Sequence, residues 1–177
     1  MDATFRDKAR CIQMLLMDVD GVLTDGTFEY GGAEETKRFH SRDGIGIVLA
    51  RRAGLKVGVI SGRESSAVIA RARQLEMDFV RLGVVDKVPA LEEALEQEGL
   101  TEEQVVFIGD DLPDLPILLR VGLSIAVSDA HEEVRTRVDY VTRARGGYGA
   151  VREAVDQILL AKGLLEDIVN GYLPSRS

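Results

Sequence analysis

The sequence predicts an α/β fold: a doubly wound, Rossmann-like parallel sheet with helices on both faces. Two observations predict it. Short apolar runs alternate along the chain with longer amphipathic stretches, and several of the apolar runs end in carboxylates or small polar residues. The chain has 177 residues, of which 45% are hydrophobic. That length suits one domain with a substantial core, so we expect a single domain over residues 1–177.

The first core strand is expected at residues 12–17, a short continuous apolar run that ends at a turn. Two carboxylates, Asp18 and Asp20, follow at once, and Gly21 allows the backbone to bend away. Two like charges about 4 Å apart repel by roughly 4 kcal/mol at an effective dielectric constant near 20. A cation or a shared proton would relieve that cost.

The next segment predicts a β-hairpin. Residues 27–30 and 34–39 flank Gly31-Gly32 with alternating apolar and polar side chains. We expect a flap over residues 26–40, which projects from the strand end that carries the acids. Because the flap is so short, no separate cap domain is expected.

The remainder alternates helices and strands. A helix is expected from Asp43, its predicted N-cap, to Gly54. The helix over residues 86–98 has one apolar face and ends at Gly99. The other strands are expected at residues 55–60, 79–82, 105–108, 123–127 and 140–141, and the other helices at 64–76, 113–120, 130–137 and 150–162. The tail from 163 to 177 is apolar enough that we expect it to pack against something.

Composition excludes several classes of protein. The formal net charge is −8, and no basic stripe is interleaved with aromatic residues, which argues against nucleic-acid binding. No apolar stretch approaches the roughly 20 residues that a membrane span needs. The single cysteine, Cys11, forms no intrachain disulfide, and no Cys/His metal spacing occurs. We therefore expect a cytoplasmic protein that binds neither membrane nor nucleic acid.

Polar side chains collect where the predicted strands end. Because the carboxyl ends of parallel strands share one edge of a sheet, these residues should converge. Carboxylates, a hydroxyl and a lysine together suit a hard cation such as Mg²⁺ and a phosphate group. One carboxylate could attack phosphorus to form an aspartyl-phosphate. The residues concerned are Asp18, Asp20, Ser61, Lys87, Asp110 and Asp111.

In this order the residues resemble the four motifs of the haloacid dehalogenase-like phosphohydrolases. The motifs are Asp18-Val19-Asp20-Gly21, Ser61, Lys87 and Gly109-Asp110-Asp111-Leu112-Pro113-Asp114. Within that superfamily the chain resembles the capless, tetrameric branch of 3-deoxy-D-manno-octulosonate 8-phosphate phosphatases. That likeness depends on Arg42-Asp43-Gly44, Ser61-Gly62-Arg63, and Gly146-Gly147 followed by Gly149-Ala150-Val151.

The resemblance implies a role for each position. Asp18 corresponds to the nucleophile and a metal ligand, and Asp20 to the general acid/base, whose backbone carbonyl also binds the metal. Asp110 corresponds to the third Mg²⁺ ligand, although the residues alone leave the choice between it and Asp111 open. Asp111 and Asp114 would be supporting residues, and Ser61 and Lys87 would hold the phosphate. Substrate contacts are implied for His40, Ser41, Arg42, Asp43, Gly44, Arg63, Arg71 and Lys87.

The implied substrate is a small phosphorylated sugar acid. The implied assembly is a homotetramer in which the C-terminal tail contacts a neighbouring subunit. Val48 departs from the pattern of the branch, which has a basic residue there. Two alternatives stay open: a phosphatase for a nine-carbon sugar-acid phosphate, and a phospho-acceptor signalling domain, which also pairs acids at a strand end with a hydroxyl and a lysine.

Overall fold

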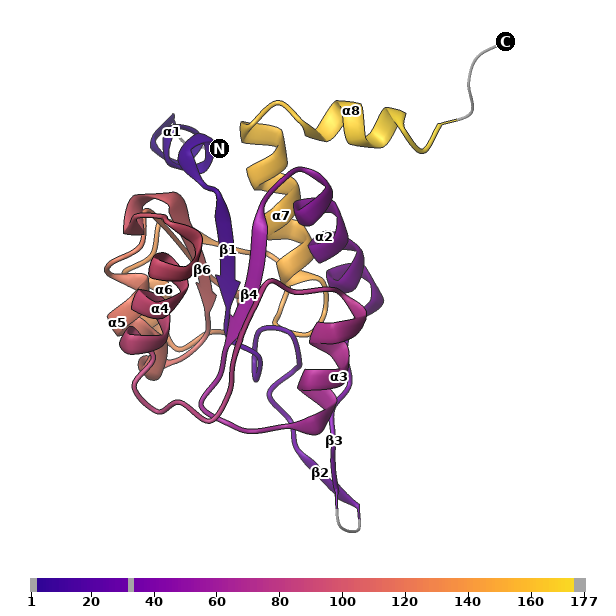
Figure 1. The fold of residues 1–177 in the computed structure, drawn as a ribbon, viewed down its shortest axis with the longest axis vertical. Coiled ribbons are helices and arrows are strands. Elements are labelled where there is room, and N and C mark those ends of the chain that lie inside the picture. The colour runs from indigo at the N-terminus through magenta and orange to yellow at the C-terminus, as the bar shows by residue number, and fades with distance from the viewer. Residues whose placement is uncertain (1–2, 32–33, 174–177) are drawn as a thin grey trace.

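The computed structural model describes residues 3–31 and 34–173 and has a central sheet of six parallel strands. Figure 1 shows this sheet between two layers of helices. The strand order is β5-β4-β1-β6-β7-β8. The strands are β1 (Met14–Met17), β4 (Lys56–Ile60), β5 (Phe79–Arg81), β6 (Val105–Gly109), β7 (Leu123–Ala126) and β8 (Tyr140–Val141). The predicted doubly wound fold is confirmed.

Helices cover both faces of the sheet. In Figure 1, α2, α3 and α7 lie on one side of the strands, and α4, α5 and α6 lie on the other. The helices are α1 (Ala3–Cys11), α2 (Ser41–Arg52), α3 (Ser66–Gln74), α4 (Val88–Glu98), α5 (Leu115–Leu118), α6 (Glu132–Arg135), α7 (Ala150–Ala161) and α8 (Leu165–Asn170). Short 3₁₀ turns, Glu102–Gln104 and Leu112–Asp114, precede β6 and α5.

The register of the sheet aligns the ends of its three central strands. All four residues of β1 are buried, as expected for a strand with neighbours on both edges and helices on both faces. Met17 lies opposite Val59 in β4 and opposite Ile108 in β6. The residues that follow these strands therefore meet at one edge, which is where Asp18, Ser61 and Asp110 are found.

Two short antiparallel strands follow the turn after β1. They are β2 (Glu29–Gly31) and β3 (Glu34–Thr36), and Figure 1 shows them projecting away from the main sheet. The two residues at the tip, 32 and 33, lie outside the described residues. Among the described residues between Gly26 and His40, these two strands are the only helices or strands.

One predicted cap is wrong. The N-cap of α2 is His40, whose Nδ1 accepts a hydrogen bond from the backbone N–H of Arg42 at 3.3 Å. Asp43 lies within the first turn and is 1% exposed. Its carboxylate accepts the backbone N–H groups of Gly149 and Arg152 at 3.0 and 2.9 Å, so it caps α7 instead. A long-range contact has replaced the local one.

Two helices were not expected from the sequence. The first is α1, which buries only Phe5 and Ala9 and packs against α7. The second is α8 in the tail, which Figure 1 shows extending beyond the sheet. Ile168 packs against the core, whereas Tyr172 and Leu173, just beyond the helix, are 63% and 60% exposed. Among the helices in the described part of the chain, none has the length and apolar character that a membrane span requires.

Candidate active site

A cavity of about 440 Å³ opens at the carboxyl edge of the sheet. Its walls come from the ends of β1 and β6, the start of α4, the hairpin segment and the loop after β4. The residues of its wall that matter for chemistry are Asp18, Asp20, Arg63, Lys87, Asp110 and Asp114. Sequence reasoning predicted every one of these as a site residue.

A buried lysine bridges two buried carboxylates at the floor of this cavity. Lys87 stands at the N-cap position of α4, and its side chain is 4% exposed. Its Nζ lies 2.8 Å from Asp18 Oδ1 and 2.7 Å from Asp114 Oδ1. A fully buried ammonium group is costly unless it is paired, and here it is paired twice.

The cavity nevertheless carries an excess of negative charge. Burial, followed by the charge of Asp114, raises the pKa of Asp18 to about 6, although Lys87 opposes the shift. Burial, followed by the charges of Asp18 and Asp114, raises the pKa of Asp110 to about 8. Burial lowers the pKa of Lys87, but the two carboxylates outweigh that effect and leave it above its usual value. One ammonium group does not balance this many acids.

The carboxylates fit a hard divalent cation. Asp18, Asp110 and Asp114 each offer an oxygen atom within 4.8 Å of the others. Asp114 already uses both oxygens: Oδ1 pairs with Lys87, and Oδ2 accepts the backbone N–H of Asp110 at 2.9 Å. Asp18 and Asp110 are therefore the carboxylates that have oxygen atoms available to coordinate a cation. Oxygen ligands of this kind are what Mg²⁺ prefers.

Asp110 belongs to this carboxylate cluster, whereas Asp111, which also lines the cavity, does not. Asp111 is exposed, and its carboxylate accepts the backbone N–H of Leu112 at 2.7 Å, so it caps the 3₁₀ turn. Asp110 is drawn into the cavity because the backbone leaves room for it. Gly21 has φ of +93°, and a Cβ atom there would lie 2.0 Å from Asp110 Oδ2.

The turn after β1 is itself held from behind by a glycine loop. The backbone N–H of Gly147 donates to the carbonyl of Val22 at 2.9 Å. A Cβ atom on Gly146 would lie 1.6 Å from the Gly21 carbonyl oxygen. The two glycines thus let the segment before α7 rest directly on the backbone of the turn.

Asp20 lies between two cations. The ammonium group of Lys37 donates to Asp20 Oδ1, and Arg63 Nε lies 3.9 Å from Asp20 Oδ2. Sequence reasoning predicted Arg63 but missed Lys37. The pattern of the hairpin offered no signal for it, because a lysine after a short polar strand is ordinarily a solvated residue.

Ser61 follows β4 and is 2% exposed. Its Oγ accepts the backbone N–H of Arg63 at 3.3 Å, and its own N–H donates to the carbonyl of Arg81 at 2.9 Å. The hydroxyl is thus fixed at the same edge of the sheet as Asp18, as predicted from the strand ends.

The other predicted substrate contacts lie elsewhere on this chain. His40 lines a separate cavity of about 150 Å³, and Ser41 and Arg71 line a third cavity. Arg71 packs over the Phe39 ring and against Gly44, where a Cβ atom would lie 2.2 Å from the guanidinium. Within a single chain, the residues that line the 440 Å³ cavity do not include these, Arg42 or the buried Asp43.

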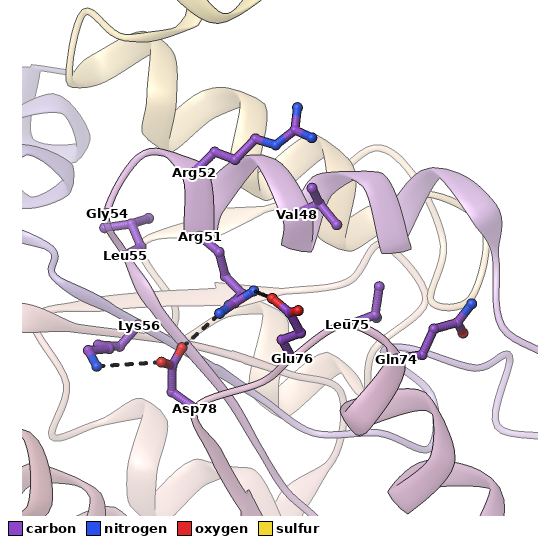
Figure 2. A pocket seen from close by; sticks show the side chains of 10 residues that line it. All are labelled: Val48, Arg51, Arg52, Gly54, Leu55, Lys56, Gln74, Leu75, Glu76 and Asp78. Atoms are coloured by element: carbon purple, nitrogen blue, oxygen red, sulfur yellow. Dashed lines mark hydrogen bonds and ion pairs between the residues drawn. The ribbon is translucent and has the colours of Figure 1, made fainter.

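A larger cavity, of about 530 Å³, lies at the opposite edge of the sheet. Figure 2 shows Arg51 between two acids there, 2.7 Å from Glu76 and 3.7 Å from Asp78. Lys56 also pairs with Asp78, at 3.4 Å. Because its charges pair among themselves, this cavity lacks the unbalanced acids of the cavity at the carboxyl edge of the sheet. Val48, the residue that departs from the family pattern, lines this second cavity and not the one at the carboxyl edge of its own chain.

The comparisons with known proteins agree with this geometry. Residues 82–153 match the model of the haloacid dehalogenase-like hydrolase family. The parallel sheet, with carboxylates and a buried lysine at its carboxyl edge, defines the same class, and the chain is a haloacid dehalogenase-like hydrolase.

Similar individual proteins identify the branch of this family to which the chain is related. The 3-deoxy-D-manno-octulosonate 8-phosphate phosphatase KdsC of Escherichia coli strain K12 is 44% identical over 161 residues, which cover 90% of this chain and 86% of the relative. The crystal structure of the phosphatase of that name from Yersinia pestis has a TM-score of 0.92 at 42% identity, covering 94% of this chain and 90% of that one. That from Moraxella catarrhalis, in complex with magnesium, phosphate and KDO, has a TM-score of 0.93 at 35% identity, with coverage of 96% and 98%.

The chain belongs to the family of 3-deoxy-D-manno-octulosonate 8-phosphate phosphatases. This membership excludes the alternative of a phospho-acceptor signalling domain.

Proposed function

We propose that this chain is a Mg²⁺-dependent phosphatase that hydrolyses 3-deoxy-D-manno-octulosonate 8-phosphate to the free sugar acid and phosphate. The observation that carries the proposal is the buried Lys87 between Asp18 and Asp114, beside Asp110, at the carboxyl edge of the sheet. The names of the relatives and the ligands of the Moraxella catarrhalis complex support the substrate and the metal.

The geometry suits covalent catalysis by Asp18. Its carboxylate would attack phosphorus and form an aspartyl-phosphate, while Asp20 protonates the departing sugar oxygen. Asp20 would then take a proton from the water that attacks the aspartyl-phosphate. This second step releases inorganic phosphate and restores both carboxyl groups to their starting states.

The phosphate needs neutralising groups in both steps. Lys87 supplies a fixed positive charge, and the Ser61 hydroxyl would donate a hydrogen bond to a phosphate oxygen. Asp18 and Asp110, with the backbone carbonyl of Asp20, would hold Mg²⁺, with Asp111 and Asp114 as supporting residues. When bound, the metal ion would withdraw negative charge from the phosphate oxygens.

The overall charge of −8 does not forbid an anionic substrate. Exposed charges beyond a Debye length of about 8 Å are largely screened at physiological salt. The cations near the cavity act at shorter range. Arg63 lines the cavity with its side chain 44% exposed, and it would meet the sugar carboxylate.

We further propose a homotetramer in which a neighbouring subunit completes the pocket. Two features support this: His40, Ser41 and Arg71 line other cavities of their own chain, and the tail presents exposed apolar residues such as Tyr172 and Leu173. Each subunit would be a single capless domain in the cytoplasm, with the flap at residues 26–40 and the tail at 163–177 as contact segments. Light scattering that found an active monomer would contradict this assembly.

A panel of sugar phosphates tests the function. Purified protein is expected to release phosphate from the eight-carbon substrate with Mg²⁺, to lose activity with a chelator, and to act less efficiently on a nine-carbon sugar-acid phosphate. Asp18→Asn should abolish turnover, and Asp20→Asn should reduce it by about 10²- to 10⁴-fold. A preference for the nine-carbon compound, or full activity of Asp18→Asn in folded protein, would overturn the assignment.

A further inference from the structure

Lys37 reaches the catalytic cavity from the hairpin. It follows β3, and its side chain is only 1% exposed. Lysine is rarely buried without a partner, because removing its charge from water is costly. Here the ammonium group donates to Asp20 Oδ1 and lies 4.8 Å from the centroid of the Phe28 ring. The hairpin thus delivers a buried cation to one oxygen of Asp20.

The second oxygen of the same carboxylate is held differently. Asp20 Oδ2 is buried and has no hydrogen-bond partner among the described residues. The nearby cation is Arg63, whose Nε is 3.9 Å away, beyond hydrogen-bond distance. The Arg63 guanidinium carbon lies 4.1 Å from the centroid of the Phe28 ring, which therefore packs against both cations. Asp20 has one anchored oxygen and one oxygen left for a proton.

We propose that Lys37 is a positioning residue for Asp20: it anchors Oδ1 so that Oδ2 is presented to the leaving oxygen and then to the attacking water. The inference rests on the proposed function, since it requires Asp20 to act as the general acid/base. It makes the base of the hairpin part of the proton-transfer machinery as well as a wall of the cavity. Displacing a reacting group by about 1 Å can cost 10²-fold in rate, so such an anchor has measurable value.

Two substrates separate positioning from the other roles that a lysine could have. A sugar phosphate has a poor leaving group and needs the proton from Asp20 when the aspartyl-phosphate forms. With p-nitrophenyl phosphate the leaving group departs without a proton, so only the second step needs Asp20. A lysine that binds substrate would change KM, and one that merely stabilises the fold would affect both substrates equally.

The test compares Lys37→Met with the unsubstituted protein and with Asp20→Asn in single-turnover and steady-state assays. For Lys37→Met we expect kcat on the sugar phosphate to fall by about 10²-fold with little change in KM. With p-nitrophenyl phosphate we expect a rapid burst of about one p-nitrophenol per active site, followed by slow turnover. Lys56→Met, at the opposite edge of the sheet, is the control and should keep both activities.

The outcomes are distinguishable. If Asp20→Asn lacks the burst followed by slow turnover, the proposed role of Asp20 fails. If Asp20→Asn shows it and folded Lys37→Met does not, the inference alone fails. A rise in KM with unchanged kcat, or equal losses on both substrates, also overturns it. Lys37→Leu, which also removes the donor and the charge, serves as a second variant if Lys37→Met does not fold, with the same difference between substrates expected.

Discussion

The α-carbon of Gly21 lies so close to the carboxylate of Asp110 that a methyl group on it would stand 2.0 Å from Oδ2. The two residues follow different strands, β1 and β6, which are hydrogen-bonded neighbours. The carboxylate that we propose as a Mg²⁺ ligand is therefore positioned by the absence of a side chain at Gly21, far earlier in the chain.

Gly21→Ala should consequently damage the metal site. The added methyl group would displace Asp110, so we expect Mg²⁺ affinity to fall by at least about 10-fold, the effect seen when metal-site support is removed. Gly54→Ala is the matched control, because Gly54 also has a positive φ, of +86°, but a Cβ atom there would meet nothing within 4 Å. Both variants should lose about 1–2 kcal/mol of stability from backbone strain. Equal Mg²⁺ affinity in the two, measured by calorimetry, would contradict this prediction.

Mg²⁺ binding should release protons. The pKa of Asp110 is about 8 and that of Asp18 about 6 in the metal-free protein, both above the ordinary 3.8. A bound cation favours the ionised forms, so about one proton should leave per Mg²⁺ at pH 7, and Mg²⁺ affinity should weaken as pH falls from about 8 to 6.

The same pKa shifts determine whether the stability of the metal-free protein rises or falls with pH. Because both pKa values are raised in the folded state, ionisation destabilises the metal-free fold as pH rises toward 8, and Mg²⁺ should offset that loss.

Titration calorimetry in two buffers with different ionisation enthalpies measures the number of protons released when Mg²⁺ binds. An identical heat of binding in both buffers would contradict the predicted release of protons.

Arg63→Ala should impair recognition of the sugar acid. Arg63 stands at the rim of the cavity beside Asp20, held over the Phe28 ring. We expect KM for the carboxylated substrate to rise by about 10-fold or more, because a charge-assisted pair is worth roughly 1.5–3 kcal/mol. KM for a phosphate ester that has no carboxylate group should change far less. Arg120→Ala, which removes a surface ion pair with Glu92 and Glu102, is the control; a similar rise in KM for both esters would remove Arg63 from carboxylate recognition.

Glu153→Gln should weaken the fold in a pH-dependent way. Although burial opposes it, hydrogen bonds from the backbone N–H groups of Arg143 and Ala144 and from the Tyr140 hydroxyl lower the pKa of Glu153 below its ordinary 4.5. A carboxyl with a depressed pKa stabilises the fold above pH 4.5, and that stabilisation is lost as pH falls through its folded-state pKa.

We therefore expect Glu153→Gln to lose about 1–3 kcal/mol at pH 7, and progressively less as pH falls through the lowered folded-state pKa of Glu153. Urea unfolding at pH 7 and at a series of more acidic pH values measures the difference. Glu96→Gln, at an exposed position of α4, should be nearly neutral throughout. A loss of stability that did not vary with pH would show that packing, not ionisation, makes Glu153 important.

The sequence predicts those parts of the fold and the candidate site that depend on local patterns, and it misses those that depend on long-range contacts. Apolar runs that end in acids predict both the strands and the edge where Asp18 and Asp110 meet, because a parallel sheet gathers its strand ends. Asp43 was misjudged as a local cap because its true partners, at the start of α7, lie more than 100 residues away. Lys37 was missed for the same reason: nothing in a hairpin sequence distinguishes a buried ammonium group from a solvated one.

The Gly146-Gly147 loop, which rests on the turn after β1, also bears on how the enzyme matures. Every residue to which we assign a role in transferring the phosphate precedes this loop in the chain. As the protein emerges from the ribosome, the whole set of reactive groups is therefore exposed before the segment that supports their turn has been made. A nascent chain stopped short of residue 146 would contain every proposed catalytic residue but lack the loop that supports their turn, so we expect hydrolytic activity only after residues 146 and 147 have been made and folded.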